Sequence, residues 1–304
     1  MNNPDIAIIL VNWNGYRDTI ECLKSLNNLT YNHFQVFIVD NGSTDNSYAL
    51  IYEHITHNFQ YKFEIQLIQN KENMGFAGGN NIAIKRACKL GFQYIWLLNN
   101  DTIVDSSSLS TLVSCITKNR NVGIVGSKIF YYNTNKIWFA GGLVNLKTGK
   151  VKHIGIKKFN NESYNHIREV DYITGCSMLF RSEIIRSIGY ISEDYFLYYE
   201  ETDFNVKAHK AGWKIIFVPN SIIYHKVSVS SGGENNLSPY YAYYDIRNAF
   251  WLCKRNNAGL PVLAFLYMIY KSIKKMIQIV IKNQKNKKER IYLILNGIRD
   301  ALLK

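Results

Sequence analysis

The chain has 304 residues, of which 47% are apolar and 14% aromatic, so it can bury a full globular core and is not a disordered chain. Its net charge of +13 is uneven, because residues 254–304 hold twelve Lys and Arg residues against two acidic ones and carry +10 of it. The +3 left for the body is too small for a nucleic-acid binder, so we expect no nucleic-acid partner.

The five cysteines are scattered and lack the pair spacing of a metal site. This indicates reduced thiols in a cytoplasmic protein rather than a disulfide framework. The first residues are polar, with no basic segment followed by an apolar one, so the sequence predicts no secretory signal.

Apolar runs of strand length alternate with helical periodicity in the first hundred residues. Such alternation predicts an α/β fold built on a mainly parallel sheet. Helices are expected from Ser43 or Thr44 to His57, after the glycine-rich stretch Asn70–Asn81, and over Ser106–Ile116, whereas residues 131–170 look irregular. The predicted strands are Asp5–Val11, Phe34–Val39, Phe63–Ile68, Phe92–Leu98, Val122–Phe130, Val170–Phe180, Trp213–Val218 and Ile222–Tyr224.

Polar residues follow each of the first four predicted strands. Each group alone is an ordinary turn sequence, since Asn, Asp and Gly are common turn formers. Parallel strands bring these ends to one edge of a sheet, where ligands bind in open α/β folds. The fourth group has a lone carboxylate flanked by amides, which suits a hard divalent cation that holds a phosphate. The groups are Asn12–Asn14, Asp40–Ser43, Asn73–Asn81 and Asn99–Asp101.

Two later features could complete a site. Glu200, Glu201 and Asp203 cluster beside aromatic residues; they are either the acidic first turn of a helix or a catalytic base. His225 follows a predicted strand, and it is either structural or a ligand. The G-x-G-x-x-G pattern of dinucleotide-binding folds does not follow the first strand.

Together these motifs resemble the inverting glycosyltransferases of the GT-A fold, and more narrowly the rhamnosyltransferase-like branch of the large family that makes surface polysaccharides. The resemblance covers about residues 5–230. It is carried by Val11–Gly15, Val39–Ser43, Asn73–Asn81, Leu98–Thr102, Thr174–Met178, Phe196–Phe204 and Tyr224–Lys226.

The resemblance implies roles for the strand-end residues. Asp40 would read the base or ribose of a nucleotide-sugar donor, and Asn99-Asn100-Asp101 stands at the family's Asp-x-Asp position, with Asn99 in place of the first acid. Asp101 and His225 would bind Mn²⁺ or Mg²⁺. The other donor-binding positions would be Asn12, Asn14, Asn73, Gly75, Asn99 and Asn100.

Glu200-Glu201 matches the motif whose second acid is the family's catalytic base, so Glu201 is our choice, with Glu200 or Asp203 as alternatives. The donor is expected to be dTDP-rhamnose, with UDP-galactofuranose, UDP-galactose or an N-acetylhexosamine nucleotide as alternatives, and the acceptor a lipid-linked or surface polysaccharide. Two other classes compete: a nucleotidyltransferase, disfavoured because Arg17 alone supplies a cation near the first loop, and a non-catalytic nucleotide-binding module.

The sequence divides into a catalytic domain, 1–235, and an appendage, 236–304. The appendage should hold an aromatic helix over 240–253 and then an apolar segment interleaved with lysines that is too short to span a bilayer. A basic amphipathic helix on the membrane surface fits this pattern, which would make the protein peripheral at the inner face of the cell membrane. A helix packed against the body or a dimer seam is the alternative. The lysines concerned are Lys271, Lys274, Lys275 and Lys282.

Overall fold

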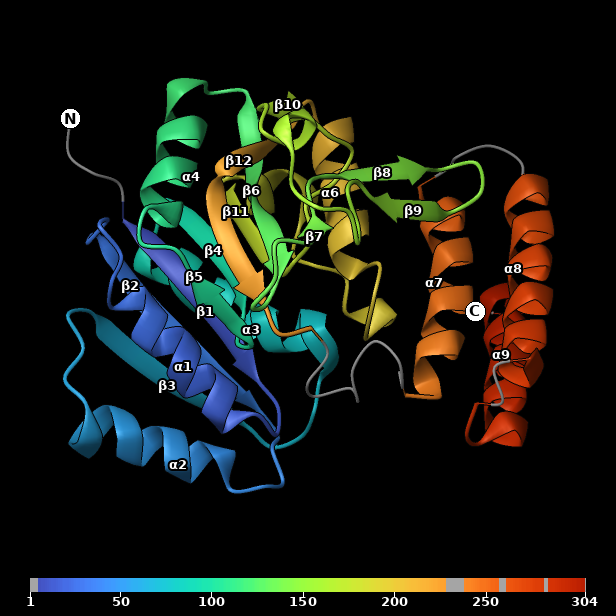
Figure 1. Ribbon diagram of the computed structural model, residues 1–304, viewed down its shortest axis with the longest axis horizontal. Coiled ribbons are helices and arrows are strands. Elements are labelled where there is room, and N and C mark those ends of the chain that lie inside the picture. Colours follow the sequence, from blue (N-terminus) through green and yellow to red (C-terminus); the bar gives the residue numbers. More distant parts are fainter. Residues whose placement is uncertain (1–4, 228–237, 257–260, 282–283, 304) are drawn as a thin grey trace.

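A computed structural model describes residues 5–227, 238–256, 261–281 and 284–303. Figure 1 shows a central sheet with helices on both faces and three further helices side by side at one end of the molecule. This confirms the α/β class with C-terminal helices. The first four strands are parallel; the first, second and fourth are largely buried, as their apolar runs predict, whereas the third, at the edge of the sheet, is only partly buried. They are β1 (Ile6–Asn12), β2 (Phe34–Asn41), β3 (Glu64–Asn70) and β4 (Tyr94–Asn99).

The main path of the sheet runs β10-β12-β6-β11-β4-β1-β2-β3. The parallel pair of β6 (Val122–Tyr131) and β12 (Lys214–His225) is separated from β4 by β11 (Ser177–Arg181), which is antiparallel to both of its neighbours. The two late strand segments predicted after residue 212 are thus one strand with an irregularity after Val218.

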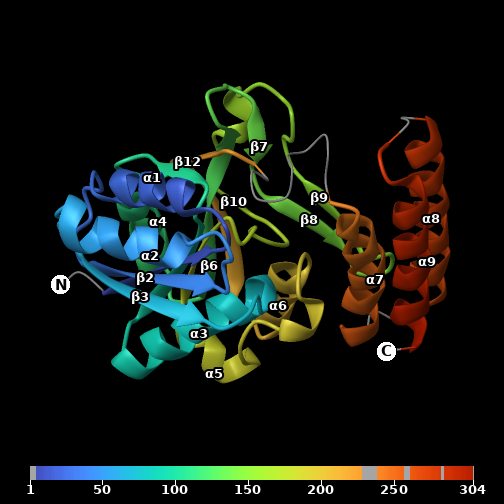
Figure 2. The same cartoon turned by 90° about the horizontal axis from the view of Figure 1, so that it is seen from below.

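The helices between the strands cover the two faces of the sheet, and Figure 2 shows this layering from below. The second helix begins later than predicted, and the helix of the glycine-rich stretch begins earlier than predicted. Ser43 and Thr44 bond to Asp40 and Asn14 instead of capping a helix, so the second helix starts at Ser47. The helices are α1 (Tyr16–Leu26), α2 (Ser47–Glu53, continued by a π-turn over His54–Asn58), α3 (Gly75–Leu90), α4 (Ser108–Lys118), α5 (Ile184–Ile188) and α6 (Glu200–Lys210).

The glycine-rich stretch is helical from Gly75, and its glycines allow close packing. A Cβ on Gly79 would lie 2.9 Å from Val11 Cγ1, so only glycine lets α3 approach β1 this closely. Gly75 has a φ of 72°, which favours glycine at the point where the chain turns into the helix.

Residues 131–170 are more regular than predicted. Some of their short strands pair with strands far away in the chain, and two pair with each other. Strands this short leave little periodicity in the local sequence. They are β7 (Ile137–Phe139) on β6, the hairpin β8 (Gly142–Asn145) with β9 (Lys150–His153), and β10 (Arg168–Glu169) on β12; β5 (Thr102–Val104) also pairs with β12.

The C-terminal helices α7 (Tyr240–Arg255), α8 (Val262–Ile281) and α9 (Lys287–Leu303) pack on one another. The aromatic helix predicted at 240–253 is α7, and its Phe250 and Trp251 are buried. No helix of the described stretches is both long enough and apolar enough to cross a membrane. The expected domain boundary at 235–236 falls outside the described residues and stays a prediction.

Two of the expected basic residues of α8 point inward. Lys271 Nζ lies 2.7 Å from Asp245 Oδ1, and Lys275 Nζ lies 2.9 Å from Asp245 Oδ2. They therefore tie α8 to α7 and do not form a basic outer surface. Lys274 is exposed, and Lys282 lies outside the described residues.

Candidate active site

The polar strand ends meet at one edge of the sheet because the strands are in register. Asn12 at the end of β1 stands opposite Asp40 at the end of β2, and Val11 stands opposite Asn99 at the end of β4. The carboxyl ends of three neighbouring strands therefore lie together at one edge of the sheet, in the place where open α/β sheets bind ligands. Asn12 and Asp40 are on the same face there, and Asn99 is on the opposite face.

A buried network surrounds Asp40, which is fully covered. Asn12 Nδ2 donates to Asp40 Oδ1 at 2.7 Å, and Ser43 Oγ donates to the same oxygen at 2.6 Å. Asn14 contributes through its backbone N–H, which donates to Ser43 Oγ, and its side chain accepts from the backbone N–H of Thr44 at 2.7 Å. The β1 and β2 ends thus form one rigid polar wall.

Asn100 joins this wall to the end of β4. Its Nδ2 donates to Thr19 Oγ1 at 2.9 Å, and Thr19 in turn donates to Asn12 Oδ1 at 2.8 Å. Thr19 is on α1, so the helix that follows the first polar loop holds two strand ends together.

Asn73 and Gly75 shape the third polar turn. Asn73 Oδ1 accepts from the backbone N–H of Gly75 at 2.9 Å and from Asn41 Nδ2 at 3.0 Å. A Cβ on Gly75 would lie 2.2 Å from the carbonyl oxygen of Phe196, so this glycine also permits contact with the loop before α6. Asn73 here is a turn-forming side chain, and its expected contact with a donor stays a prediction.

Asp101, which follows the end of β4, and His225, at the end of β12, form a pair. His225 Nε2 lies 3.0 Å from Asp101 Oδ1, and Asn99 Nδ2 lies 3.4 Å from the same ring nitrogen. Both members of the pair are buried. Trp138 packs edge-on against the imidazole with ring centroids 4.6 Å apart and fixes its orientation.

The charges of this pair are complementary. Burial alone would lower the pKa of His225, but Cys176 and Asp101 beside it raise that pKa well above its ordinary value. Burial likewise acts to raise the pKa of Asp101, yet the imidazolium outweighs it, so the carboxyl pKa is lowered. Each side chain therefore favours the charged form of the other.

The donor set fits a divalent cation bound to a phosphate. Asp101 Oδ1 and His225 Nε2 lie 3.0 Å apart, so both atoms could reach one ion between them. Mn²⁺ accepts carboxylate and imidazole ligands, and a cation would replace the proton on the ring. No cluster of three or more His, Cys, Asp or Glu ligands occurs in the described part of the chain, so the remaining ligands would be phosphate oxygens and water.

The turn Thr174–Cys176 connects this pair to Glu201. A Cβ on Gly175 would lie 3.6 Å from Glu201 Cβ, and the backbone N–H of Gly175 hydrogen-bonds the Glu201 carboxylate. Burial raises the pKa of the Cys176 thiol, His225 opposes this, and the nearby carboxylates of Asp101 and Glu201 add to it. Asp101, His225 and Glu201 therefore surround one turn and share one site.

Glu200 and Glu201 begin α6; Glu200 is buried and Glu201 is partly buried. Burial raises the pKa of Glu201, although backbone N–H groups that hydrogen-bond the carboxylate oppose it. Burial and the neighbouring Glu201 raise the pKa of Glu200 well above its ordinary value. Within the described residues, neither Oε2 atom has a hydrogen-bond partner, so each acid has one buried oxygen whose hydrogen-bonding capacity is unmet.

Asp203 has a different environment. Its carboxylate accepts from Asn256 Nδ2 at 2.7 Å and pairs with Lys207 Nζ at 2.7 Å. These contacts tie the first turn of α6 to the end of α7. Asp203 is thus engaged on both oxygens, unlike Glu200 and Glu201.

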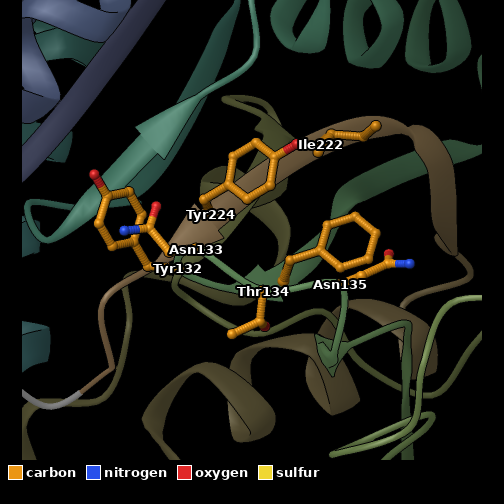
Figure 3. A pocket seen from close by; sticks show the side chains of 7 residues that line it. Tyr132, Asn133, Thr134, Asn135, Ile222 and Tyr224 are labelled. Carbon is orange, nitrogen blue, oxygen red and sulfur yellow. The ribbon is translucent and has the colours of Figure 1, made fainter.

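A separate open hollow of about 570 Å³ is lined by Tyr132, Ile222 and Tyr224 among others, and Figure 3 shows their side chains. Successive side chains of a strand point to opposite faces of the sheet, so Tyr224 and His225 face opposite sides of β12. The hollow therefore does not belong to the site around Asp101.

Several residues of the site were not singled out from the sequence. Asn41 and Ser43 lay within the polar group Asp40–Ser43, but the sequence assigned them no role in the site. Thr19 and Trp138 carry no local signal, since a helical threonine and a tryptophan in an irregular stretch acquire their roles through distant contacts.

The strand order and these polar strand ends define a GT-A type protein, and solved structures have the same fold. Staphylococcus aureus TarS 1–349 matches with a TM-score of 0.60 at 15% identity, covering 98% of this chain and 81% of that one. The mannosyltransferase PcManGT from Pyrobaculum calidifontis, in complex with GDP-Man and Mn²⁺, matches with a TM-score of 0.60 at 13% identity, covering 99% and 76%.

The chain belongs to Glycosyl transferase family 2, whose model matches residues 7–189. It is 25% identical to the dTDP-rhamnosyl transferase RfbF of Shigella flexneri over 98% of this chain and 96% of that protein. It is 23% identical to the poly-beta-1,6-N-acetyl-D-glucosamine synthase of Staphylococcus epidermidis over 75% of this chain but only 51% of the synthase, so it spans about half the length of that relative.

Proposed function

We propose that the protein is a metal-dependent inverting glycosyltransferase that moves a sugar from a nucleoside-diphosphate donor to a hydroxyl of a glycan or lipid-linked acceptor. The observation that carries this proposal is the convergence of Asp101, His225 and Glu201 on the turn at Gly175-Cys176. A cation-binding pair and a carboxylate with an unpaired oxygen are the two functions that single-displacement sugar transfer requires.

Asp101 and His225 would hold Mn²⁺ or Mg²⁺ against the donor diphosphate. When bound, such an ion acts as a Lewis acid that neutralises charge on the leaving phosphate. The residues around Asp40, including Asn12 and Asn100, would receive the nucleoside, because they line the neighbouring strand ends.

Glu201 would accept the proton of the acceptor hydroxyl through its unpaired Oε2. Its raised pKa brings it closer to neutral pH, where a general base is most effective. One base and one displacement would invert the anomeric carbon. Glu200 lies next to it and is the alternative base.

For the donor we propose dTDP-rhamnose, because RfbF is the named relative that aligns over nearly its whole length. A UDP-linked N-acetylhexosamine is the alternative, which the poly-N-acetylglucosamine synthase supports. Agl10 of Haloferax volcanii, a hexosyltransferase of low-salt glycan biosynthesis, is 24% identical over 81% of this chain and 74% of its own length.

Thermal shift with dTDP and UDP, with and without Mn²⁺, tests nucleotide and metal binding together. We expect stabilisation that needs both the nucleotide and the ion. A panel of dTDP- and UDP-sugars then identifies the donor by release of the free nucleotide. Equal stabilisation with and without Mn²⁺ would contradict the metal assignment.

We further propose that α8 lies on an anionic bilayer surface on the cytoplasmic side. Six apolar side chains repeat at three- and four-residue steps along one face of the helix, and each is 51–59% exposed. An exposed apolar surface of this kind marks a membrane or protein contact. Lys274 on this helix and Lys285 and Lys288 after it are exposed, and such cations favour an anionic surface. The six residues are Leu263, Leu266, Tyr270, Ile273, Ile277 and Val280.

Point substitutions on this face test the membrane contact better than deletion, because removing α8 and α9 would uncover the buried side of α7. Leu266→Glu with Ile273→Glu should abolish cosedimentation with phosphatidylserine vesicles. The control, Tyr52→Glu, alters an exposed residue of α2 and should leave it unchanged. If the parent chain does not cosediment with the vesicles and instead dimerises through this face, the membrane proposal is wrong.

A further inference from the structure

The loop that leads into Glu200 and Glu201 has an unfavourable backbone conformation. Phe196, Tyr198 and Tyr199 have φ values of 63°, 66° and 73°. Bulky residues rarely adopt this region, and they remain there only when surrounding contacts hold them. Some part of the protein must therefore stabilise this loop.

Two adjacent residues of α7 supply those contacts. Asn248 Nδ2 lies 3.1, 2.8 and 2.8 Å from the carbonyl oxygens of Tyr195, Leu197 and Tyr198. Arg247 Nη2 donates to the carbonyl oxygens of Tyr195 at 2.8 Å and of Asp194 at 3.1 Å. Four carbonyls of the loop, those of residues 194, 195, 197 and 198, are thus bound by donors from one helix.

Arg247 and Asn248 are themselves held in place. Arg247 Nε donates to Asn248 Oδ1 at 2.8 Å, which turns the Asn248 NH₂ group toward the loop. The guanidinium stacks 4.1 Å from the Trp251 ring and donates to the Tyr243 hydroxyl, which donates to Asp300 of α9. Both side chains are buried, Asn248 completely.

The opposite side of the loop rests on α3. The backbone N–H of Phe76 donates to the Phe196 carbonyl at 2.9 Å, and the Phe196 ring stacks on Tyr244 of α7 at 5.5 Å. The loop is therefore clamped between the glycine-rich helix α3 and α7. Loss of the hydrogen bonds from α7 would let the start of α6 move, and Glu201 lies there, two residues beyond Tyr199.

We propose that Arg247 and Asn248 are positioning residues for the catalytic base: they hold the 194–199 loop in its strained form and so direct the Glu201 carboxylate at the reaction centre. This inference rests on the proposed function. The site already reaches beyond residues 7–189, the stretch that the family model matches, through Glu201 and His225, and this inference extends it into the C-terminal helices.

The test compares Asn248→Leu, which keeps the shape but removes the donors, with Arg247→Lys and with Leu252→Ala. Leu252 is buried on the same helix, and its truncation weakens packing while leaving every hydrogen bond to the loop. We expect Asn248→Leu to speed amide exchange in residues 194–203 and to lower kcat about 100-fold with donor KM within about twofold. Arg247→Lys should be intermediate, and Leu252→Ala should lower Tm but keep the parental kcat.

Turnover is followed as nucleotide released from dTDP-rhamnose and UDP-N-acetylglucosamine. A folded Asn248→Leu protein with parental loop exchange would overturn the proposal, whether or not either donor is turned over. A raised KM at unchanged kcat would also overturn it, because the clamp would then serve binding. Glu201→Gln is measured in parallel: parental turnover there, with loss in Asn248→Leu, would refute the base assignment and leave the clamp standing.

Discussion

His225 Nε2 lies 3.0 Å from Asp101 Oδ1, and the register of the sheet fixes this distance. His225 at the end of β12 stands opposite Thr102 in β5, so the residue before Thr102 is brought to the imidazole. A slip of one residue would turn His225 to the face that Tyr224 occupies. The pair therefore depends on the pairing of two segments far apart in the chain.

Asp101→Asn should remove the Mn²⁺-dependent part of the stabilisation by dTDP or UDP, because the amide is a much weaker ligand for the ion. It should also destabilise the protein without ligand, since it leaves a buried imidazolium without its counter-charge, a loss of about 3–5 kcal/mol in comparable pairs. Thermal shift measures both effects. Asp105→Asn is the control, because asparagine serves equally well where Asp105 accepts hydrogen bonds from Ser107.

Glu201→Gln should lower kcat by ~10²–10⁴-fold, the usual contribution of a general base, while nucleotide and Mn²⁺ binding persist. The activity of the parental enzyme should fall as the pH is lowered, with a midpoint above the ordinary pKa of a glutamate, because burial raises the pKa of Glu201. Rates of nucleotide release against pH measure both. If Glu200→Gln is inactive and Glu201→Gln active, the roles of the two acids are reversed.

The sequence predicted the half of the site that lies at the parallel strand ends. Asn12, Asp40 and Asn99 each follow an apolar run, and the geometry of a parallel sheet then brings them together without further information. The antiparallel β11 between β4 and β6 could not be foreseen, because strand order is set by long-range packing rather than by local pattern.

The C-terminal helices show more clearly what the sequence alone could not predict. The apolar segment interleaved with lysines predicted a helix correctly, but not that Lys271 and Lys275 turn inward to Asp245. Which face of an amphipathic helix is covered depends on the partner surface, and here α7 offers a buried carboxylate. The contacts of Asn248 with the 194–199 loop are hidden for the same reason.

Glu200→Gln should stabilise the protein at neutral and alkaline pH. The pKa of Glu200 is raised well above its ordinary value by burial and by Glu201, so ionising it costs stability as pH rises through the folded-state pKa. Glutamine resembles the protonated acid and avoids that cost. Tm measured at pH 5 and pH 8.5 should show a gain that grows with pH, whereas a loss at both would mean that a partner holds the carboxylate ionised.

Asp245→Asn should destabilise the protein by about 3–5 kcal/mol at pH 7, because it leaves Lys271 and Lys275 facing each other without a counter-charge. Burial acts to raise the pKa of Asp245, but the two lysines outweigh it and hold that pKa at about 2. Stability from this carboxylate is therefore present above its unfolded pKa of about 4 and is lost as pH falls toward 2.

Urea unfolding of the parent and of Asp245→Asn at pH 7 and pH 3 measures this difference, which should shrink at the lower pH. The control is Glu169→Gln, which breaks the 3.7 Å contact with Lys214 between two half-exposed side chains. Surface pairs of this kind contribute about 0–1 kcal/mol, so its effect should be small at either pH. An equal loss for the two variants would mean that the link between α7 and α8 is no stronger than a surface contact.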